Sequence, residues 1–205
     1  MTPRPTQARG DIAIAILAAG SSSRLGEPKQ LLRIRGRTLL EHAARTALSA
    51  KCGPVVVVLG AHARTLRPLL ADLPVRITIN RKWSGGLGTS IAAAVRTAER
   101  LRPPVAAILL MLCDQVHLTA TIVTKLVRAW RKREGEKDIV ACAYANTFGP
   151  PAIFPRRLFE DLLNLRPAQG AKPILRSHGA EFTAIPFRRG EEDIDTPADR
   201  ARAYL

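Results

Sequence analysis

The sequence has few aromatic residues and no long apolar run, and these two absences exclude whole classes of protein. Aromatic residues make up 4% of the 205 residues. They do not alternate with basic residues as they do in base-stacking surfaces for nucleic acids. The longest apolar run, Val105 to Cys113, has the length of a buried strand and is far shorter than the ~20 residues that cross a bilayer. We therefore expect neither a nucleic-acid-binding protein nor a membrane protein.

Cysteines and histidines are also scarce and poorly spaced for metal binding or disulfides. Cys52, Cys113 and Cys142 are odd in number and far apart, and the four histidines show no metal-ligand spacing. Free thiols suit a reducing compartment, so we expect a cytoplasmic protein.

Acidic residues are outnumbered by basic ones, 17 to 32, which gives a formal net charge of +15. The basic residues are spread along the whole chain, with a short cluster near Arg131 at the end of an expected helix. Such a charge can attract a small polyanionic substrate.

Apolar strand-like runs alternate with helical patterns along the chain, as in a doubly wound, mainly parallel α/β sheet. We expect a three-layer α/β fold of Rossmann-like type, with helices on both faces of a twisted sheet. Residues 1–10 are expected to form a flexible tail and residues 11–205 a single domain. The expected strands are 12–17, 54–59, 75–79, 105–112, 139–143, 152–154 and 182–185. The expected helices are 38–48, 63–71, 88–100, 119–132, 157–164, 171–177 and a last one from residue 197.

Ligands of such sheets bind at the carboxyl ends of the strands, and the segment after the first strand has unusual chemistry there. Gly20 permits close approach of the backbone, and the amides of Ser21 to Ser23 can face an anion. Arg24 and Lys29 add positive charge suited to phosphate oxygens. The spacing matches neither the P-loop nor the dinucleotide fingerprint, and a polar surface turn is the alternative.

Three further segments follow strand ends. In the segment from Asn80 to Ser90, glycines before a helix leave room for a ring or a sugar, unless it is simply a flexible loop with a good helix cap. Asp114 directly follows an apolar strand and suits Mg²⁺, although it could instead cap the next turn. An acidic run includes Asp193 and Asp195, of which one could reach a metal; a solvated acidic turn is the alternative.

Taken together, five segments resemble the nucleotidyltransferases of the molybdenum cofactor family. They are LAAGSSSRLGEPKQLL (17–32), NRKWSGGLGTSI (80–91), LLMLCDQ (109–115), GPPAIFPRRLF (149–159) and DIDTPAD (193–199). Within the family the resemblance is to the cytidylyltransferase branch, because the guanylyltransferase branch usually has Gly-Gly where Ala19-Gly20 stands here.

The resemblance implies a reaction in which CMP moves from CTP to the terminal phosphate of molybdenum cofactor and pyrophosphate leaves. It implies catalytic roles for Arg24, Lys29 and Asp114, and Mg²⁺ bound by Asp114 with Asp195 as a second ligand. The implied partners are CTP and molybdenum cofactor, with a transient contact to a molybdoenzyme or its chaperone. The implied nucleotide-binding residues are Ala18, Ala19, Gly20, Ser21, Ser22, Arg24, Lys29, Asn80, Gly85, Gly86 and Ser90.

The sequence departs from the family pattern at two places. Val116 stands where the family usually has proline after Asp-Gln, and residues 167–169 (Pro-Ala-Gln) replace a Gly-Asp pattern near the acceptor. Another nucleotide, such as GTP, with a different phosphorylated acceptor therefore stays an alternative, as does a non-catalytic chaperone that binds molybdenum cofactor.

Overall fold

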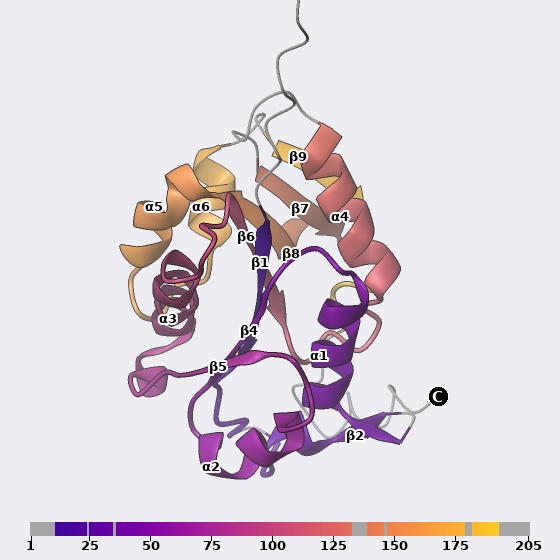
Figure 1. Cartoon of the computed structure of the whole chain (residues 1–205), viewed down its shortest axis with the longest axis vertical. Coiled ribbons are helices and arrows are strands. Elements are labelled where there is room, and N and C mark those ends of the chain that lie inside the picture. The colour runs from indigo at the N-terminus through magenta and orange to yellow at the C-terminus, as the bar shows by residue number, and fades with distance from the viewer. Residues whose placement is uncertain are drawn as a thin grey trace, which may run out of the picture.

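The computed structural model describes residues 11–23, 25–34, 36–132, 139–145, 147–178 and 182–192. Its main feature is a seven-stranded sheet with the order β5-β4-β1-β6-β8-β7-β9 (Figure 1). Only β8 runs antiparallel to its neighbours, β6 and β7. The strands are β1 (Ile12–Ala18), β4 (Val55–Leu59), β5 (Arg76–Ile79), β6 (Ala107–Leu112), β7 (Ile139–Tyr144), β8 (Thr147–Pro155) and β9 (Phe182–Pro186). The predicted mainly parallel α/β sheet is confirmed.

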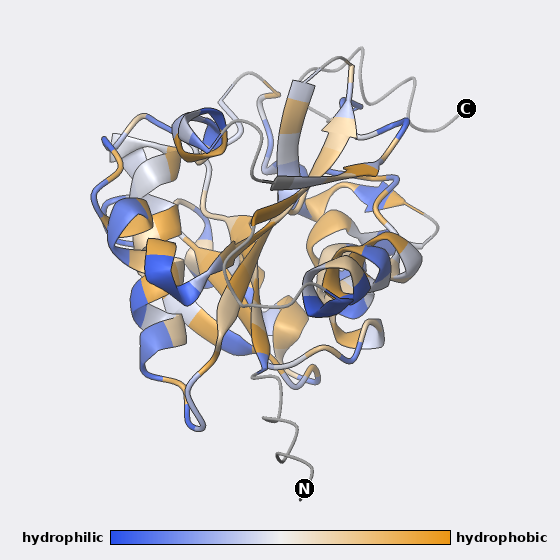
Figure 2. Ribbon diagram, turned by 90° about the horizontal axis from the view of Figure 1, so that it is seen from above, coloured by the Kyte–Doolittle hydropathy of each residue, from blue (hydrophilic) through white to orange (hydrophobic). Residues whose placement is uncertain are grey.

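Helices cover both faces of this sheet, so its central strands are apolar on both sides. All residues of β1 and β4 are buried, which is why they read as continuous apolar runs rather than alternating ones. On one face lie α1 (Leu39–Ser49), α2 (Ala63–Leu66) and α4 (Ala120–Lys132), and on the other α3 (Leu87–Glu99), α5 (Phe159–Leu163) and α6 (Lys172–Ser177). The strands are apolar along their length, whereas the helices are apolar mainly towards the sheet (Figure 2).

Short 3₁₀ turns complete the described elements. They are η1 (Lys29–Leu31), η2 (Arg67–Leu70), η3 (Trp83–Gly85) and η4 (Arg156–Leu158). Two of them, η2 and η4, occupy parts of segments predicted as α-helix, and Pro68 and Pro155 lie at or beside their first residues. None of the described helices combines the length and apolarity needed to span a membrane.

Several predicted elements differ from the structure. The helix expected from residue 88 or 89 begins at Leu87, with Gly86 as its N-cap. The strand expected at 152–154 is the longer β8, which forms a hairpin with β7. A small hairpin of β2 (Arg33–Ile34) and β3 (Arg37–Thr38) was not predicted, because its two-residue strands are too short to show a period. The predicted last helix, from residue 197, lies outside the described residues.

The three cysteines are free and buried, as the sequence indicated. Burial raises the pKa of the Cys142 thiol to about 12, so this thiol stays protonated at neutral pH. Its position in the fully buried part of β7 makes it a packing residue.

A capping box fixes the start of α1. The Thr38 hydroxyl accepts a hydrogen bond from the Glu41 amide at 3.2 Å, and the Glu41 carboxylate accepts one from the Thr38 amide at 2.9 Å. The Thr38 side-chain hydrogen bond, together with the backbone one, lowers the pKa of Glu41. The reciprocal bonds satisfy two backbone donors that would otherwise lack partners.

Replacing Thr38 with alanine is expected to lower the free energy of unfolding by about 1 kcal/mol, because the cap is lost. Urea unfolding at neutral pH measures this change, with the exposed Thr121→Ala in α4 as the control, for which we expect little loss. Because the pKa of Glu41 is lowered, its contribution is complete above the ordinary glutamate pKa and disappears as the pH falls through the lowered value. Equal losses in both variants would contradict the role of the cap.

Candidate active site

An ion pair between Lys29 and Asp114 joins the ends of two neighbouring strands. Asp114 lies two residues beyond β6 and is 6% exposed, while Lys29 begins η1 after the segment that follows β1. Because β1 and β6 are parallel neighbours with Leu17 opposite Leu112, both segments leave the same edge of the sheet. The Lys29 ammonium contacts Oδ2 of Asp114. The structure therefore brings together two of the residues predicted to be catalytic.

Gln30 organises the segment after β1, and sequence reasoning missed it. Its side chain is 1% exposed, and its Nε2 donates to the carbonyl oxygens of Ala18 at 3.2 Å and Gly20 at 2.9 Å. Its Oε1 accepts from the Ser22 hydroxyl at 3.4 Å, and that hydroxyl accepts from the Lys29 amide at 3.0 Å. Gln30 thus ties the start of the segment to its end, and Lys29 is anchored by the same network.

Two residues after β4 bind the same segment from the other side. The Ala61 amide donates to the Ala19 carbonyl at 3.0 Å, and Nε2 of His62 lies 3.0 Å from the Ser21 carbonyl oxygen. Gly60 must be glycine here, because a Cβ would lie 2.5 Å from the Ala19 carbonyl oxygen. His62 was likewise not predicted, since nothing in its sequence context sets it apart.

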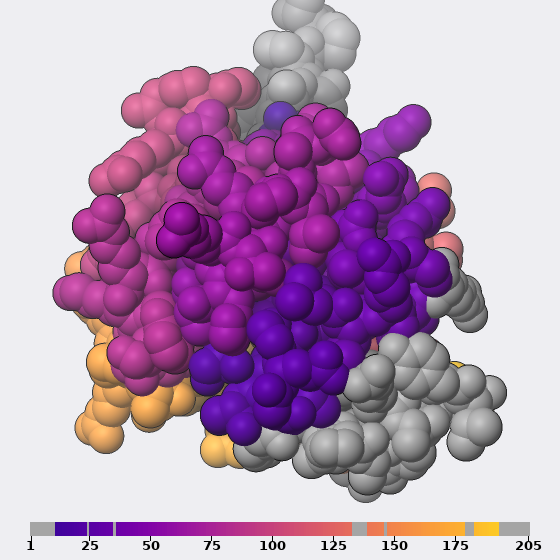
Figure 3. All heavy atoms as spheres, turned by 90° about the horizontal axis from the view of Figure 1, so that it is seen from below, coloured from indigo at the N-terminus to yellow at the C-terminus, as the bar shows by residue number. Residues whose placement is uncertain are grey.

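In the segment after β1, these contacts use the backbone carbonyl oxygens and leave the backbone amides available for a ligand. The carbonyl oxygens of Ala18, Ala19, Gly20 and Ser21 all accept hydrogen bonds from within the chain. The amides of residues 20–23 donate none to the residues that the structure describes. Successive amides with unused donors form a site for an anion. Figure 3 shows this edge of the molecule, where the atoms of the segment after β1 (indigo) lie beside those of the segments after β4 and β5 (purple).

Asn80 and Ser90 bind each other rather than leaving their polar atoms open. Nδ2 of the buried Asn80 donates to the hydroxyls of Thr89 at 2.8 Å and Ser90 at 3.0 Å, and its Oδ1 accepts from the Lys82 amide at 2.9 Å. The network fixes the first turn of α3 to the end of β5. Any contact of these two side chains with a nucleotide would have to use the hydrogen-bonding capacity that these bonds leave.

The glycines at the start of α3 serve a packing role that the sequence did not reveal. A Cβ on Gly88 would lie 2.4 Å from the carbonyl oxygen of Arg166, and one on Gly86 would lie 2.8 Å from the Cα of Ala168. Residues 166–169 fill the space on the side where a side chain would point, and the expectation that these glycines leave room for a ring or a sugar elsewhere stays a prediction. Gly85 is less crowded, with Thr89 Cγ2 at 3.1 Å.

Replacing Gly88 with alanine is expected to lower the free energy of unfolding by about 1–3 kcal/mol, because a backbone oxygen must move. Thermal or urea unfolding measures the loss. Gly20→Ala is the control for stability, since a Cβ there meets no atom within 4 Å. A Gly88→Ala protein as stable as the control would contradict the packing account.

Three residues that the sequence singled out, Arg24, Asp193 and Asp195, lie outside the described residues. Within the described ranges, no three His, Cys, Asp or Glu side chains form a group that could hold a metal ion. Asp114 nevertheless fits magnesium, which is commonly held by one or two carboxylates with phosphate oxygens and water as the other ligands.

The segment after Asp114 is held by the chain near residue 190. Nε2 of Gln115 donates to the Pro150 carbonyl at 2.9 Å and to the Gly190 carbonyl at 3.4 Å. His117 lies 2.9 Å from Glu192, and hydrogen bonds from Arg189 lower the pKa of Glu192 to about 2. These contacts bring the end of the described chain, just before residues 193–199, to the Asp114 side of the sheet edge.

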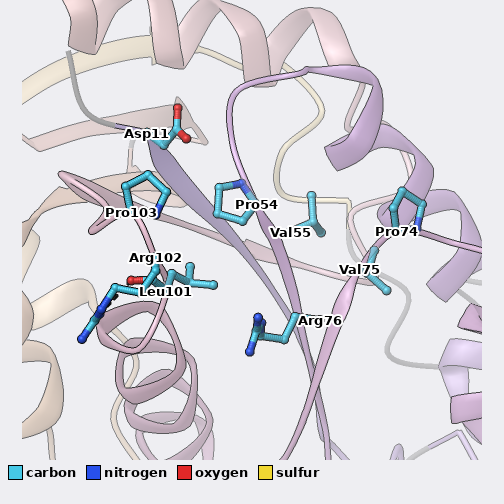
Figure 4. A pocket seen from close by; sticks show the side chains of 9 residues that line it. All are labelled: Asp11, Pro54, Val55, Pro74, Val75, Arg76, Leu101, Arg102 and Pro103. Atoms are coloured by element: carbon cyan, nitrogen blue, oxygen red, sulfur yellow. Dashed lines mark hydrogen bonds between the residues drawn. The ribbon is translucent and has the colours of Figure 1, made fainter. Parts of the chain in front are cut away.

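A pocket of about 600 Å³ lies at the other end of the sheet (Figure 4). It is formed where strands begin, by Asp11, Pro54, Val55, Pro74, Val75, Arg76, Leu101, Arg102 and Pro103. Ligands of parallel sheets bind at the opposite, carboxyl edge. The pocket is therefore separate from Lys29 and Asp114.

Residues 14–182 match the model of the MobA-like NTP transferase domain. The chain belongs to the MobA-like NTP transferase family. Its sheet is that of a nucleotidyltransferase-type enzyme, and the predicted family is confirmed at this level.

Two proteins that are similar to this chain in sequence have different names. The chain is 40% identical over 139 residues to nicotine blue oxidoreductase from Paenarthrobacter nicotinovorans, covering 67% of this chain and 64% of that protein. It is 28% identical over 194 residues to the purine catabolism protein PucB from Bacillus subtilis, covering 89% of this chain and 91% of that protein.

Solved structures agree with this membership. Rv0371c from Mycobacterium tuberculosis H37Rv has 27% identity and a TM-score of 0.78, over 95% of this chain and 97% of that one. A structure of the same protein in complex with manganese has 25% identity and a TM-score of 0.76, over 95% of this chain and 98% of that one. A divalent metal is therefore bound by at least one protein of similar fold and sequence.

Replacing Gln30 with alanine is expected to weaken binding of a nucleoside triphosphate by about tenfold, because the segment that carries the amides and Lys29 loses its internal support. Isothermal titration calorimetry with CTP measures this. The control is Thr121→Ala, an exposed polar residue of α4 outside this network. Equal affinity of Gln30→Ala and wild type would contradict the positioning role.

Proposed function

We propose that this MobA-like NTP transferase moves CMP from CTP onto the terminal phosphate of molybdenum cofactor and releases pyrophosphate. The observation that carries the proposal is the buried Asp114 paired with Lys29, beside unused amides at the carboxyl edge of a parallel sheet. That combination offers positive charge, hydrogen-bond donors and one metal ligand at the same place. A triphosphate has the complementary charge and oxygen atoms.

The roles of the residues follow from their chemistry. The amides of residues 20–23 bind phosphate oxygens, and Lys29, with Arg24, neutralises the charge that develops on the leaving pyrophosphate. Asp114 would hold Mg²⁺, and Asp195 is proposed as a second ligand. When bound, the metal would supply charge stabilisation to the phosphate oxygens. Backbone groups near Ala19 and the segment 85–90 are proposed to hold the base and ribose.

The acceptor already has an ionised phosphate at neutral pH, so no side chain has to act as a strong base. The chain has to align the acceptor oxygen with the phosphorus and to exclude water from the reaction. In-line attack forms the new O–P bond as the bond to pyrophosphate breaks. Because no base is needed, the site can consist mainly of hydrogen-bond donors and positive charge, with Asp114 as its carboxylate among the described residues.

The choice of cytidine and of molybdenum cofactor rests on Ala19 and on the family resemblance of the sequence. Ala19 stands where guanylyltransferases usually have glycine, and its methyl group is packed against Gly60. PucB and nicotine blue oxidoreductase show that relatives of similar sequence have different names and tasks. The alternatives are GTP or another nucleotide with a different phosphorylated acceptor, or binding of molybdenum cofactor without turnover.

The proposal is tested by pyrophosphate release with each of the four nucleoside triphosphates, in the presence and absence of molybdenum cofactor and Mg²⁺. We expect release with CTP that depends on both the cofactor and the metal. Preference for GTP would contradict the assignment of the base. No release with any nucleotide would contradict transfer to this acceptor.

Replacing Asp114 with asparagine is expected to lower the rate of release by about 10²-fold or more, because a charged group at the reacting phosphates is lost. Asp72→Asn, at an exposed position away from this edge, is the matched control and should keep the wild-type rate. Wild-type turnover of Asp114→Asn would rule out Asp114 as the metal ligand.

A second candidate function is oxidation and reduction, favoured by the 40% identity to nicotine blue oxidoreductase. Loss of the nicotine blue absorbance, with a reduced nicotinamide dinucleotide added as the electron donor, tests this directly. Such activity without any pyrophosphate release would favour the second candidate over the first.

A further inference from the structure

A basic groove runs along the outer edge of the sheet, between β5 and α3. Its volume is about 480 Å³, and its walls include four cationic side chains, of Arg81, Lys82, Arg96 and Arg100, but no carboxylate. All four cationic residues are exposed. Within the described chain none of the four is in an ion pair. The groove is therefore a concentration of uncompensated positive charge in one place, in a chain whose excess charge is otherwise scattered.

The β5 strand offers free backbone groups beside this charge. It is the terminal strand of the seven-stranded sheet and pairs with β4. The Asn80 amide donates to the Leu59 carbonyl of the strand β4. Because successive residues of a strand direct their backbone groups to opposite sides, those of Thr78 also face β4, while those of Ile77 and Ile79 face outwards. The outer edge thus has donors and acceptors for another strand.

Apolar surface accompanies these groups. Ile79 is 47% exposed and lies at the groove. Because the Thr78 side chain points to α3, where it bonds Thr97, the Ile79 side chain lies on the opposite face of the β5 edge. Partly buried Leu163 and Leu165 form the opposite wall. No aromatic residue is among the lining residues, so the groove has no surface on which nucleic-acid bases could stack. Its combination of backbone, apolar and cationic groups fits a polypeptide better than a nucleic acid or a free phosphate.

We propose that the groove between β5 and α3 docks an acidic, extended segment of a partner protein, which adds to the edge of β5. Backbone hydrogen bonds from Ile77 and Ile79 give the segment its orientation. Acidic side chains of the segment pair with Arg81, Lys82, Arg96 and Arg100, and an apolar side chain covers Ile79. The groove is lined at one end by Asn80 and Thr89, which belong to the segment 80–90 of the candidate active site. The docking does not depend on which reaction that site performs.

The proposal is tested with a peptide of alternating Glu and Val, about ten residues long, which is the upper length of a common strand. A peptide of alternating Gln and Val is its control. Fluorescence anisotropy measures the affinity for the full chain. We expect binding of the acidic peptide that weakens with salt and is absent, or at least about tenfold weaker, for the Gln peptide.

The double variant Arg96→Glu with Arg100→Glu places two reversed charges in the groove. Lys125→Glu with Arg128→Glu is the matched control, because it changes the same net charge on the exposed face of α4. We expect the groove variant to bind the acidic peptide at least about tenfold more weakly, and the control variant to bind as wild type does. Equal weakening in both variants would overturn the proposal, because net charge alone would then explain binding.

Amide hydrogen exchange of the wild-type chain tests strand addition separately. Bound acidic peptide is expected to slow exchange at Ile77 and Ile79, whose amides face outwards. Binding without such protection would overturn addition to β5. Competition by a duplex oligonucleotide or by inorganic phosphate at the same ionic strength would show that the groove selects anions rather than a polypeptide. A change in molar mass of the groove variant by light scattering would point to a second copy of the chain, and would likewise overturn the proposal.

Discussion

The contact between Lys29 and Asp114 is the interaction on which the candidate active site depends. It places an ammonium group and a nearly buried carboxylate together at one edge of the sheet. A carboxylate in that position needs a cation or hydrogen-bond donors to offset its loss of water. In this structure Lys29 supplies the cation, and during the proposed reaction the metal would share that task. The site therefore contains one positive and one negative side chain. A charged ligand can form new ion pairs with both of them, so that neither charge is left unpaired.

The sheet makes this contact possible. Parallel pairing of β1 with β6 brings residues that are 85 positions apart to the same edge. Gln30 and His62 then fix the segment between β1 and η1, so that its carbonyl oxygens are used internally and its amides remain available. The apolar strands pair in parallel, and this pairing brings the segment after β1 to the sheet edge. Buried hydrogen bonds then set the shape of that segment. Membership of the MobA-like NTP transferase family agrees with that outcome, while the nucleotide and acceptor rest on the proposal.

The central strands of the sheet and the position of Asp114 could be predicted from the sequence, because both depend on neighbouring residues in the chain. The fully apolar runs at β1, β4 and β6 indicated strands covered on both faces, and Asp114 stood out as a charge directly after such a strand. The roles of Gln30, Gly86 and Gly88 could not be predicted, because they depend on which distant segments approach them. Gly88 reads as loop glycine until residues 166–169 are seen against it. Gln30 likewise reads as one more polar residue after Lys29 until its buried bonds to Ala18 and Gly20 are known.

The most direct test of the central claim is to locate the nucleotide on the chain. Backbone amide chemical shifts can be recorded by NMR while a non-hydrolysable CTP analogue and Mg²⁺ are added. The account predicts saturable shifts at residues 20–23, at Lys29 and at Asp114, with no shifts around Pro54 and Pro103 at the opposite end of the sheet. Saturable shifts confined to that opposite end, with residues 20–29 unchanged, would contradict the account.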